Sequence, residues 1–366
     1  MTHTYRRALS GLLIALAAVF SLPAQAQETD IEADIAFVLD VLRTDYAGWP
    51  TKTEGEREAE FDAEVALMRQ RIAENPAART WAISMLLDWF EDEHLYVRSN
   101  IVSPPNPWAG ERAKGRTYDY RPAPGPDFAV TRLSDETMMI RVPSFNPDYL
   151  EEFEGLLEAN HDAITSTPNL LIDLRGNSGG ADRMYEKLMS YLYTRPIYGI
   201  GVEWRESDRN AATLREYLAD GTYPEEAREI VDDLLARAAA SDDDFVRLYE
   251  DGISITTYPQ VYDFPKRVGI LTEGAGSSGD QFAMDARFSR KVTLMGAPSA
   301  GVIDYSNVIG AQAPSGDFSI NWPMTRSMRL PEEPFDNVGV PVDVAYPEGV
   351  TDQIEWAKAW LESRAD

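Results

Sequence analysis

The sequence contains no cysteine and only three histidines in 366 residues. The absence of cysteine excludes disulfide bonds, thiolate metal ligands and a cysteine nucleophile, so an ordinary apolar core must hold the fold together. The chain also has no His-Glu-x-x-His stretch or comparable cluster. We therefore expect neither a metal ion nor another cofactor.

Basic residues are scarce as well. The chain has 34 lysines and arginines against 61 aspartates and glutamates, which gives a formal net charge of −27. A surface of this charge repels nucleic acid and anionic membranes, so neither is expected as a partner. Solubility explains the charge more simply than selection of a cationic substrate does.

Long hydrophobic runs are absent except at the N-terminus. There, Arg6 and Arg7 precede the apolar run Leu9–Leu22, and Ala24-Gln-Ala26 follows it. This order is typical of a secretory signal peptide, here residues 1–26, and the run is short for a membrane-spanning helix. We predict an exported protein with no membrane insertion after cleavage, most simply a periplasmic one. An uncleaved anchor is the alternative.

The remaining chain divides into three regions by its sequence pattern. Apolar residues at helical spacing predict a helical domain over residues 27–100. Clustered prolines predict an extended linker over residues 101–127, which leaves no room for a separate peptide-binding module. Alternating strand and helix patterns then predict an α/β core over residues 128–366. An acidic helical insertion at about residues 205–255 interrupts this core and is interpreted either as a lid or as a solvated excursion.

Two short stretches of the core indicate chemistry. Arg175-Gly-Asn-Ser-Gly-Gly180 follows a buried strand, and its glycines leave backbone N–H groups free to bind an oxyanion. Gly276-Ser-Ser-Gly-Asp280 also follows an apolar strand and puts a serine at a helix start, where the helix dipole favours developing negative charge. Together they indicate a serine hydrolase with Ser277 as nucleophile. A plain helix N-cap remains the other use for Ser277 or Ser278.

A serine nucleophile needs a base, and few side chains qualify. His3 leaves with the signal peptide, and His161 ends a predicted helix, where a structural role is expected. A histidine mechanism must therefore use His94, although a surface or capping role is open to it as well. A serine–lysine dyad would instead need a buried lysine. The core offers four lysines, none of them convincing: Lys187, Lys266, Lys291 and Lys358.

Four stretches together resemble the tricorn and C-terminal-processing (tail-specific) family of serine peptidases. They are Asp92-Glu-His-Leu-Tyr-Val97, Ile140-Arg-Val-Pro-Ser-Phe145, the glycine stretch ending at Gly180, and Gly276–Asp280 with the following Phe282-Ala283. The resemblance covers residues 30–100 and 128–362. It implies an α/β fold with a ClpP/crotonase-like β-α superhelical core and an N-terminal helical domain.

Two departures from the family pattern favour one branch of the family over the other. The lysine base of the processing branch is missing, since Ser299-Ala-Gly-Val302 stands at the matching place, and so is that branch's PDZ module. The resemblance therefore favours the tricorn-like branch, in which histidine is the base. The stretch Asp336-Asn-Val-Gly-Val-Pro-Val-Asp343 looks like that branch's acidic stretch. Asp336 would then be the acidic catalytic member, or else a loop-capping aspartate, and Glu93 stands where tricorn has a serine.

The resemblance implies acyl transfer from a peptide. Ser277 would attack the carbonyl, and His94 would take its proton and return it to the leaving amine. The N–H groups of Gly179 and Ser278 would bind the oxyanion. Supporting roles are expected for three further residues: Glu93, Arg175 and Asp280.

The sequence thus predicts an exported serine peptidase that hydrolyses peptides or unfolded protein tails through an acyl-enzyme. Glu93 beside His94 and the shortened acid Asp336 keep open a catalytically impaired binding protein on the same scaffold. An esterase or amidase using the same site is the other alternative. The sequence predicts no particular oligomeric state.

Overall fold

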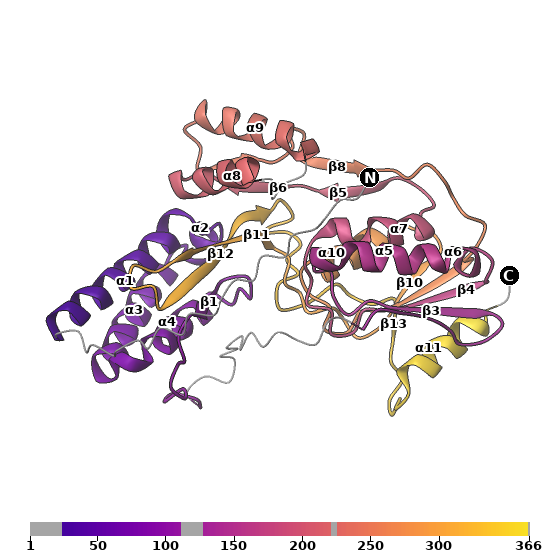
Figure 1. Ribbon diagram of the computed structural model, residues 1–366, viewed down its shortest axis with the longest axis horizontal. Helices are drawn as coiled ribbons and strands as arrows, with labels where there is room; N and C mark the ends of the chain where they lie inside the picture. Colours follow the sequence, from indigo (N-terminus) through magenta and orange to yellow (C-terminus); the bar gives the residue numbers. More distant parts are fainter. Residues whose placement is uncertain (1–23, 111–126, 221–224, 365–366) are drawn as a thin grey trace, which may run out of the picture.

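The computed structural model describes residues 24–110, 127–220 and 225–364 (Figure 1). The predicted signal peptide lies outside these residues except for its last three, which begin helix α1 (Ala24–Thr44). Most of the predicted linker, residues 111–126, also lies outside them. In the described parts of the chain, none of the helices combines the length and the apolar character needed to cross a membrane.

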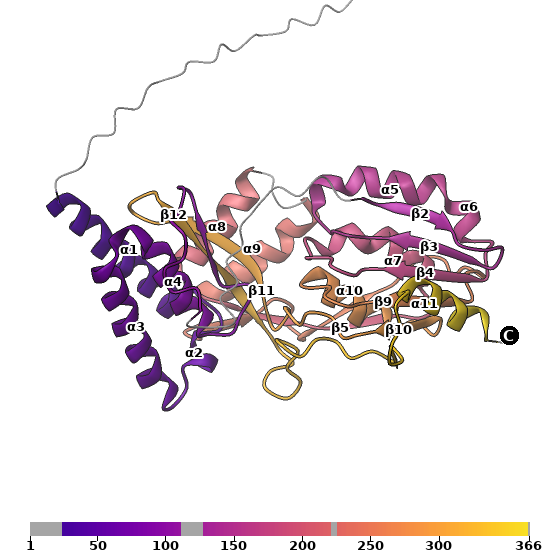
Figure 2. The ribbon, with the colours of Figure 1, turned by 90° about the horizontal axis from the view of Figure 1, so that it is seen from below.

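A six-stranded sheet forms the centre of one end of the molecule (Figures 1 and 2). In spatial order its strands are β13 (Val344–Ala345), β10 (Val292–Gly296), β9 (Arg267–Leu271), β4 (Asn169–Asp173), β3 (Thr137–Arg141) and β2 (Ala129–Arg132). Neighbouring strands are parallel except for the β2–β3 pair. Strands of a parallel sheet are covered on both faces, which is why the centre of β4, Leu170-Leu-Ile172, is apolar and the whole strand is buried.

Helices cover both faces of this sheet, as Figure 1 shows. The first face carries η2 (Pro147–Tyr149), α5 (Leu150–Ala159), α6 (His161–Ile164), η3 (Asp182–Tyr185), α7 (Glu186–Leu192) and α10 (Ser278–Ala286). Phe153, Leu188 and Phe282 anchor these helices in one apolar cluster. Helix α11 (Gln353–Glu362) packs on the second face through Leu361. The protein therefore has the predicted α/β fold.

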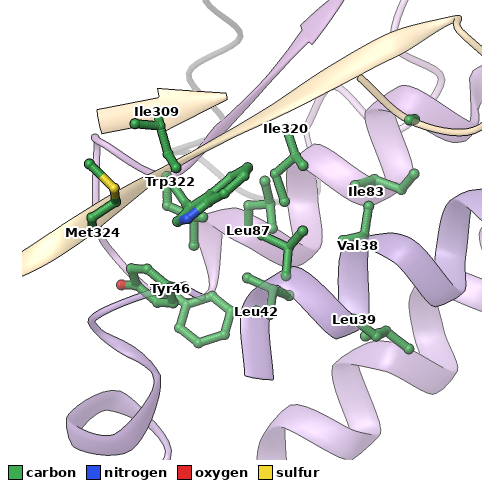
Figure 3. Close-up of a cluster of buried hydrophobic side chains, with 14 of the residues drawn as sticks. Val38, Leu39, Leu42, Tyr46, Ile83, Leu87, Ile309, Ile320, Trp322 and Met324 are labelled. Atoms are coloured by element: carbon green, nitrogen blue, oxygen red, sulfur yellow. The ribbon is translucent and has the colours of Figure 1, made fainter. Parts of the chain in front are cut away.

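The N-terminal helices form the opposite end of the molecule. They are α1, α2 (Trp49–Lys52), α3 (Arg57–Glu74), η1 (Pro76–Ala78) and α4 (Arg79–Asp88). A second, antiparallel sheet completes their core: β1 (Tyr96–Ser99), β12 (Phe318–Ser327), β6 (Val202–Arg205) and β7 (Phe245–Arg247) lie in this order, and β11 (Tyr305–Gln312) also pairs with β12. Figure 3 shows Leu42 and Leu87 of the helices near Trp322 of β12.

This arrangement differs from the predicted division at residue 100. Strands β6, β7, β11 and β12 come from the region assigned to the α/β core, yet they share the apolar cluster of the N-terminal helices. The reason is long-range antiparallel pairing, such as Tyr96 with Asn321, which leaves no mark in the local pattern. His94, just before β1, is thereby fixed to a sheet built mainly from the second half of the chain.

The acidic insertion is packed rather than solvated. Its helices, α8 (Asp208–Asp220) and α9 (Glu225–Ala239), bury Leu214 and Leu234 in the same cluster as the N-terminal helices. Trp322 Nε1 donates a hydrogen bond to Asn210 Oδ1 at 3.0 Å and ties α8 to β12. Beside these helices, β5 (Ile197–Ile200) and β8 (Ile253–Thr256) form a separate two-stranded sheet that the sequence pattern did not reveal.

Candidate active site

The glycine turn after β4 and the serine turn after β9 meet, because the two strands are neighbours in the sheet. The Gly276 N–H donates to the Asn177 carbonyl oxygen at 2.8 Å. Gly179 has a φ of +88°, and a Cβ added to it would lie 2.6 Å from Ser277 Cβ. Only glycine allows so close an approach with this backbone conformation. The two stretches singled out in the sequence therefore form one site.

Ser277 has an uncommon backbone conformation, with φ 57° and ψ −119°. It occupies the N-cap position of α10 but makes no capping hydrogen bond with its side chain. The capping interpretation of this serine is therefore not supported, and its hydroxyl is available for other contacts. A strained non-glycine residue of this kind is found where surrounding structure holds it in place, often at functional sites.

The buried Asp280 carboxylate holds the serine turn in place. It accepts backbone hydrogen bonds from Ser277, from Gly301 at 3.0 Å and from Val302 at 2.9 Å, and it also accepts the Ser299 hydroxyl. Burial raises the pKa of Asp280, while these hydrogen bonds act in the opposite direction. Asp280 thus supports Ser277 through its backbone rather than through its hydroxyl.

His94 lies beside Ser277 although 183 positions separate them in the sequence. Its Nε2 is 3.0 Å from Ser277 Oγ, and its Nδ1 is 2.5 Å from the Tyr305 carbonyl oxygen. A carbonyl can only accept, so Nδ1 carries the proton and Nε2 is free to accept one from the serine. The arrangement suits general-base catalysis.

Asp92 fixes the turn that carries His94. Its Oδ1 accepts the His94 backbone N–H at 2.9 Å, and its Oδ2 accepts the Tyr46 hydroxyl at 2.8 Å. Glu93 lies half-buried between the two residues of this turn. Sequence reasoning did not assign roles to Tyr46 or Asp92, although the Asp-x-His spacing is the signal that could have identified Asp92.

The structure does not place Asp336 in contact with the His94 ring. Its Oδ1 accepts the N–H groups of Ile303 at 2.9 Å and Asp304 at 2.8 Å, while the Tyr305 carbonyl lies beside His94 Nδ1. Asp336 therefore caps the loop that leads to Tyr305, whose carbonyl contacts His94. Burial, and secondly the negative charge of Asp92, raise the pKa of Asp336 to about 7.

Of the two predicted oxyanion donors, only Ser278 has a free amide. Ser278 is the first residue of α10, where a helix leaves its N–H groups without intrahelical acceptors. The Gly179 N–H instead donates to Asn177 Oδ1 at 2.8 Å, so the expectation for Gly179 is not supported. Asn177 is fully buried and also donates to the Val142 carbonyl, which makes it the organiser of this turn.

The Gly180 N–H is a candidate oxyanion donor that sequence reasoning did not identify. Phe145 hydrogen-bonds to the Gly179 carbonyl and to the Ala181 N–H, both at 2.9 Å. Backbone groups of successive extended residues point to opposite sides, so the Gly180 N–H points away from Phe145. Phe145 follows β3 and the Ser277 turn follows β9, and β4 lies between these two strands. The Gly180 N–H therefore points toward the Ser277 turn.

Arg175 supports the glycine turn from outside the site. Its Nε and Nη2 donate to the two oxygens of Asp173 at 2.7 and 2.9 Å, and its Nη1 reaches Gln353. Arg175 therefore supports the start of the glycine turn rather than Ser277 or His94 directly.

The remaining candidate bases have other partners. His161 Nδ1 lies 3.2 Å from the Tyr191 hydroxyl, and both residues are distant in sequence from the serine turn. The four core lysines contact groups other than Ser277: Glu158 for Lys187, the Phe264 ring for Lys266, the Tyr262 carbonyl for Lys291 and Glu355 for Lys358. Throughout residues 24–110, 127–220 and 225–364, no group of three or more His, Asp or Glu side chains could hold a metal ion.

Comparisons with known proteins agree with this geometry. The family model described as peptidase family S41 matches residues 136–345. A protein from Parabacteroides merdae ATCC 43184 described as a peptidase has a TM-score of 0.61 at 15% identity, over 92% of this chain and 98% of that one. Mature CPAF has a TM-score of 0.60 at 12% identity, over 88% and 93%. A lipoprotein from Streptococcus agalactiae has a TM-score of 0.50 at 14% identity, over 95% and 100%.

At these identities the solved structures show a common fold, an α/β core with an N-terminal helical region. A comparison with curated protein sequences finds no match.

Proposed function

The chain belongs to peptidase family S41 and is a serine peptidase, and from this premise we propose that Ser277 is its nucleophile and His94 its general base. The observation that carries the proposal is the 3.0 Å separation between His94 Nε2 and Ser277 Oγ. This is hydrogen-bond distance, as proton transfer requires. The orientation of the ring by the Tyr305 carbonyl supports the same assignment.

The reaction proceeds through an acyl-enzyme. Ser277 Oγ attacks the peptide carbonyl carbon while His94 Nε2 takes the hydroxyl proton. The tetrahedral intermediate collapses when His94 gives this proton to the leaving amine. Water then attacks the ester on Ser277, again with His94 as base, and releases the second product. The Tyr305 carbonyl accepts the Nδ1–H throughout and stabilises the imidazolium that forms transiently.

The oxyanion is bound, in this proposal, by the N–H groups of Ser278 and Gly180. The Ser278 amide lies at the positive end of the α10 dipole, which favours negative charge. The Gly180 amide replaces the predicted Gly179 amide, since the latter already donates to Asn177. Loss of one such donor costs about a hundred- to thousandfold in rate in other serine hydrolases.

Export and substrate class form the second part of the proposal. The N-terminal segment with Arg6, Arg7 and the Ala24-Gln-Ala26 site favours secretion across the inner membrane, and the periplasm as the place of action. Peptides and unfolded protein tails are the proposed substrates. Ser277 is half-buried, and an extended chain reaches a half-buried nucleophile more readily than a folded protein does.

The test is hydrolysis of a peptide library by the mature protein and by Ser277→Ala and His94→Ala variants. Both variants are expected to lose activity by about a thousandfold or more. Ser166→Ala and His161→Ala are matched controls, because these residues lie away from the site, and they should retain turnover. Full activity in either site variant would contradict the mechanism.

A further inference from the structure

A groove of about 310 Å³ lies beside α10 and is not part of the site described above. Three segments form its walls: α10 with the turn after it, strand β5, and residues 329–335. Each wall contributes large apolar side chains, among them Ile200, Phe288 and Phe335. Grooves with an apolar lining and a few polar groups are typical ligand sites.

The floor of the groove leads away from the nucleophile along one helix face. Gln281 and Met284 follow Ser277 at spacings of four and seven residues, which place their side chains on one face of α10, and Phe288 lies in the turn just after this helix. At 1.5 Å per residue, the helical part of the floor runs from about 6 Å beyond Ser277 to about 14 Å at Ala286, and Phe288 continues it. An extended peptide covers that interval with about three residues.

Among the described strands, only β8 pairs with β5, so the other edge of β5 can pair with such a peptide. Strand β5 forms a two-stranded sheet with β8, and the Gly201 N–H donates toward β8, to the Gly252 carbonyl, at 2.9 Å. Backbone groups alternate along an antiparallel pair, so those of Tyr198 and Ile200 point away from β8. The side chains of these two residues are 50% and 51% exposed. Extended peptides bind at edges of this kind as an added strand.

A buried arginine in the groove lacks a full set of partners. The Arg329 side chain is only 8% exposed. Its Nη2 donates to Asp304 Oδ1 at 3.1 Å, its Nη1 contacts Met284 Sδ, a weak acceptor, and its Nε has no partner in the described structure. A buried donor without an acceptor is costly, so a ligand oxygen at this position would be bound favourably.

The groove is less acidic than the rest of the molecule. Arg195, Arg287 and Arg329 line the groove together with Asp285 and Glu333, and Asp304 pairs with Arg329, so three cations balance three carboxylates on a chain whose net charge is −27. Both oxygens of Asp285 already accept hydrogen bonds, from the Tyr185 hydroxyl at 3.0 Å and from Gln281 Nε2 at 2.8 Å. The groove is thus close to neutral on a strongly acidic molecule, which makes it a more favourable place for a carboxylate than the surface around it.

We propose that this groove binds the substrate peptide next to the scissile bond and selects segments in which a carboxylate accompanies apolar residues, with Arg329 as the specificity-determining residue. The inference rests on the proposed role of Ser277, because the groove begins one helical turn from it. A C-terminal carboxylate and an Asp or Glu side chain present the same two oxygens. The choice between these sources is made by experiment.

Binding is tested first with the full-length mature Ser277→Ala variant, so that no turnover interferes. Four labelled apolar peptides are compared by fluorescence anisotropy: one with an internal Glu, its Gln match, one with a free C-terminal carboxylate, and its amide. At least one carboxylate peptide should bind about tenfold or more tightly than its neutral match. The pair that shows the preference identifies the source. Equal affinities in both pairs would overturn the proposal.

Substitutions assign the preference to the groove. Arg329→Gln should abolish it, and Ile200→Glu, a change at an exposed position that need not perturb folding, should weaken carboxylate binding more than neutral binding. Arg132→Gln is the matched control, since Arg132 is exposed on β2 outside the groove, and it should keep the preference. Retention of the preference in both groove variants would reject the proposal.

The two proposals fail in distinguishable ways. If the unmodified enzyme shows no Ser277-dependent hydrolysis while the carboxylate preference persists, the proposed catalytic function is wrong and the ligand class of the groove stands. If hydrolysis depends on Ser277 but both peptide pairs bind equally, the function stands and the inference about Arg329 is wrong.

Discussion

The carbonyl oxygen of Tyr305 lies 2.5 Å from Nδ1 of His94, at the place that a carboxylate takes in a serine–histidine–aspartate triad. A carbonyl holds the histidine tautomer and ring orientation as a carboxylate does, but it is uncharged. The nearby Asp336 carboxylate acts one step further away, by capping the N–H groups of Ile303 and Asp304. Substitutions of Asp336 should therefore have the effects expected of a loop cap and not those expected of a triad acid.

The first prediction separates a loop cap from a triad acid. Asp336→Asn keeps a side-chain oxygen that can accept both loop N–H groups, so kcat should fall by about tenfold or less. Asp336→Ala leaves these groups without their acceptor and should reduce kcat further while lowering stability by about 1–3 kcal/mol. Steady-state kinetics and urea unfolding measure both effects. A loss of about ten thousandfold in the Asn variant would instead indicate a triad acid.

The second prediction concerns pH. Burial raises the pKa of Asp336 to about 7 in the folded protein, against about 4 for an unperturbed aspartate. Between these values the folded state binds more protons than the unfolded state, so the contribution of Asp336 to stability falls as pH rises from about 4 to about 7 and is constant above. The slope is up to about 1.4 kcal/mol per pH unit.

Urea unfolding at pH 5, 6 and 8 can measure this slope as a difference between the unmodified protein and Asp336→Asn. Buried carboxylates that do not interact with Asp336, such as Asp285, contribute equally to both proteins and cancel. The unmodified protein should therefore gain stability relative to the variant as pH falls. A difference that does not change with pH would show that Asp336 is ionised throughout the range.

The third prediction tests the close contact of the two turns. Gly179→Ala puts a Cβ 2.6 Å from Ser277 Cβ at a φ of +88°, so it should displace the nucleophile and reduce kcat/KM by about a hundredfold or more. Gly155→Ala is the control: it lies within α5 with no atom near the added Cβ, and it should leave activity unchanged and raise stability by about 0.5–1 kcal/mol. Normal activity of Gly179→Ala would mean that the turns are further apart than described.

The fourth prediction tests whether the acidic insertion belongs to the N-terminal core. Leu234 of α9 is 2% exposed in that core, so Leu234→Ala should destabilise the protein by about 2–5 kcal/mol. Ile230 of the same helix is 37% exposed, and Ile230→Ala should cost much less. Thermal or urea unfolding decides the matter. Equal, small effects of both substitutions would show that α9 is loosely attached.

The central sheet and the contact between Ser277 and His94 could be predicted from the sequence. The strand before the glycine turn contains the apolar run Leu170-Leu-Ile172, which is typical of a parallel sheet, and the shortage of histidines left His94 as the histidine to pair with Ser277. The structure places these two residues 3.0 Å apart. The motif residues therefore identified which side chains meet, although no local pattern indicated how.

The domain boundary and the hydrogen-bond partners within the site depend on contacts between distant segments, so they could not be predicted from the sequence. The pairing of Tyr96 with Asn321 joins the N-terminal helices to strands far along the chain, so the predicted domain boundary did not match the apolar clusters. Likewise, which acceptor the Gly179 N–H or the Asp336 carboxylate chooses is set by loop geometry. Residue type and spacing predict that such groups lie near a site but not which partner each one takes.

The most direct test of the account is labelling with a fluorophosphonate serine reagent, followed by mass spectrometry of the modified peptide. We expect a single adduct on Ser277 in the unmodified protein, with labelling slowed by about a thousandfold in His94→Ala because the hydroxyl then lacks its base. Labelling of another residue, or equal labelling rates with and without His94, would contradict the assignment of this pair as nucleophile and base.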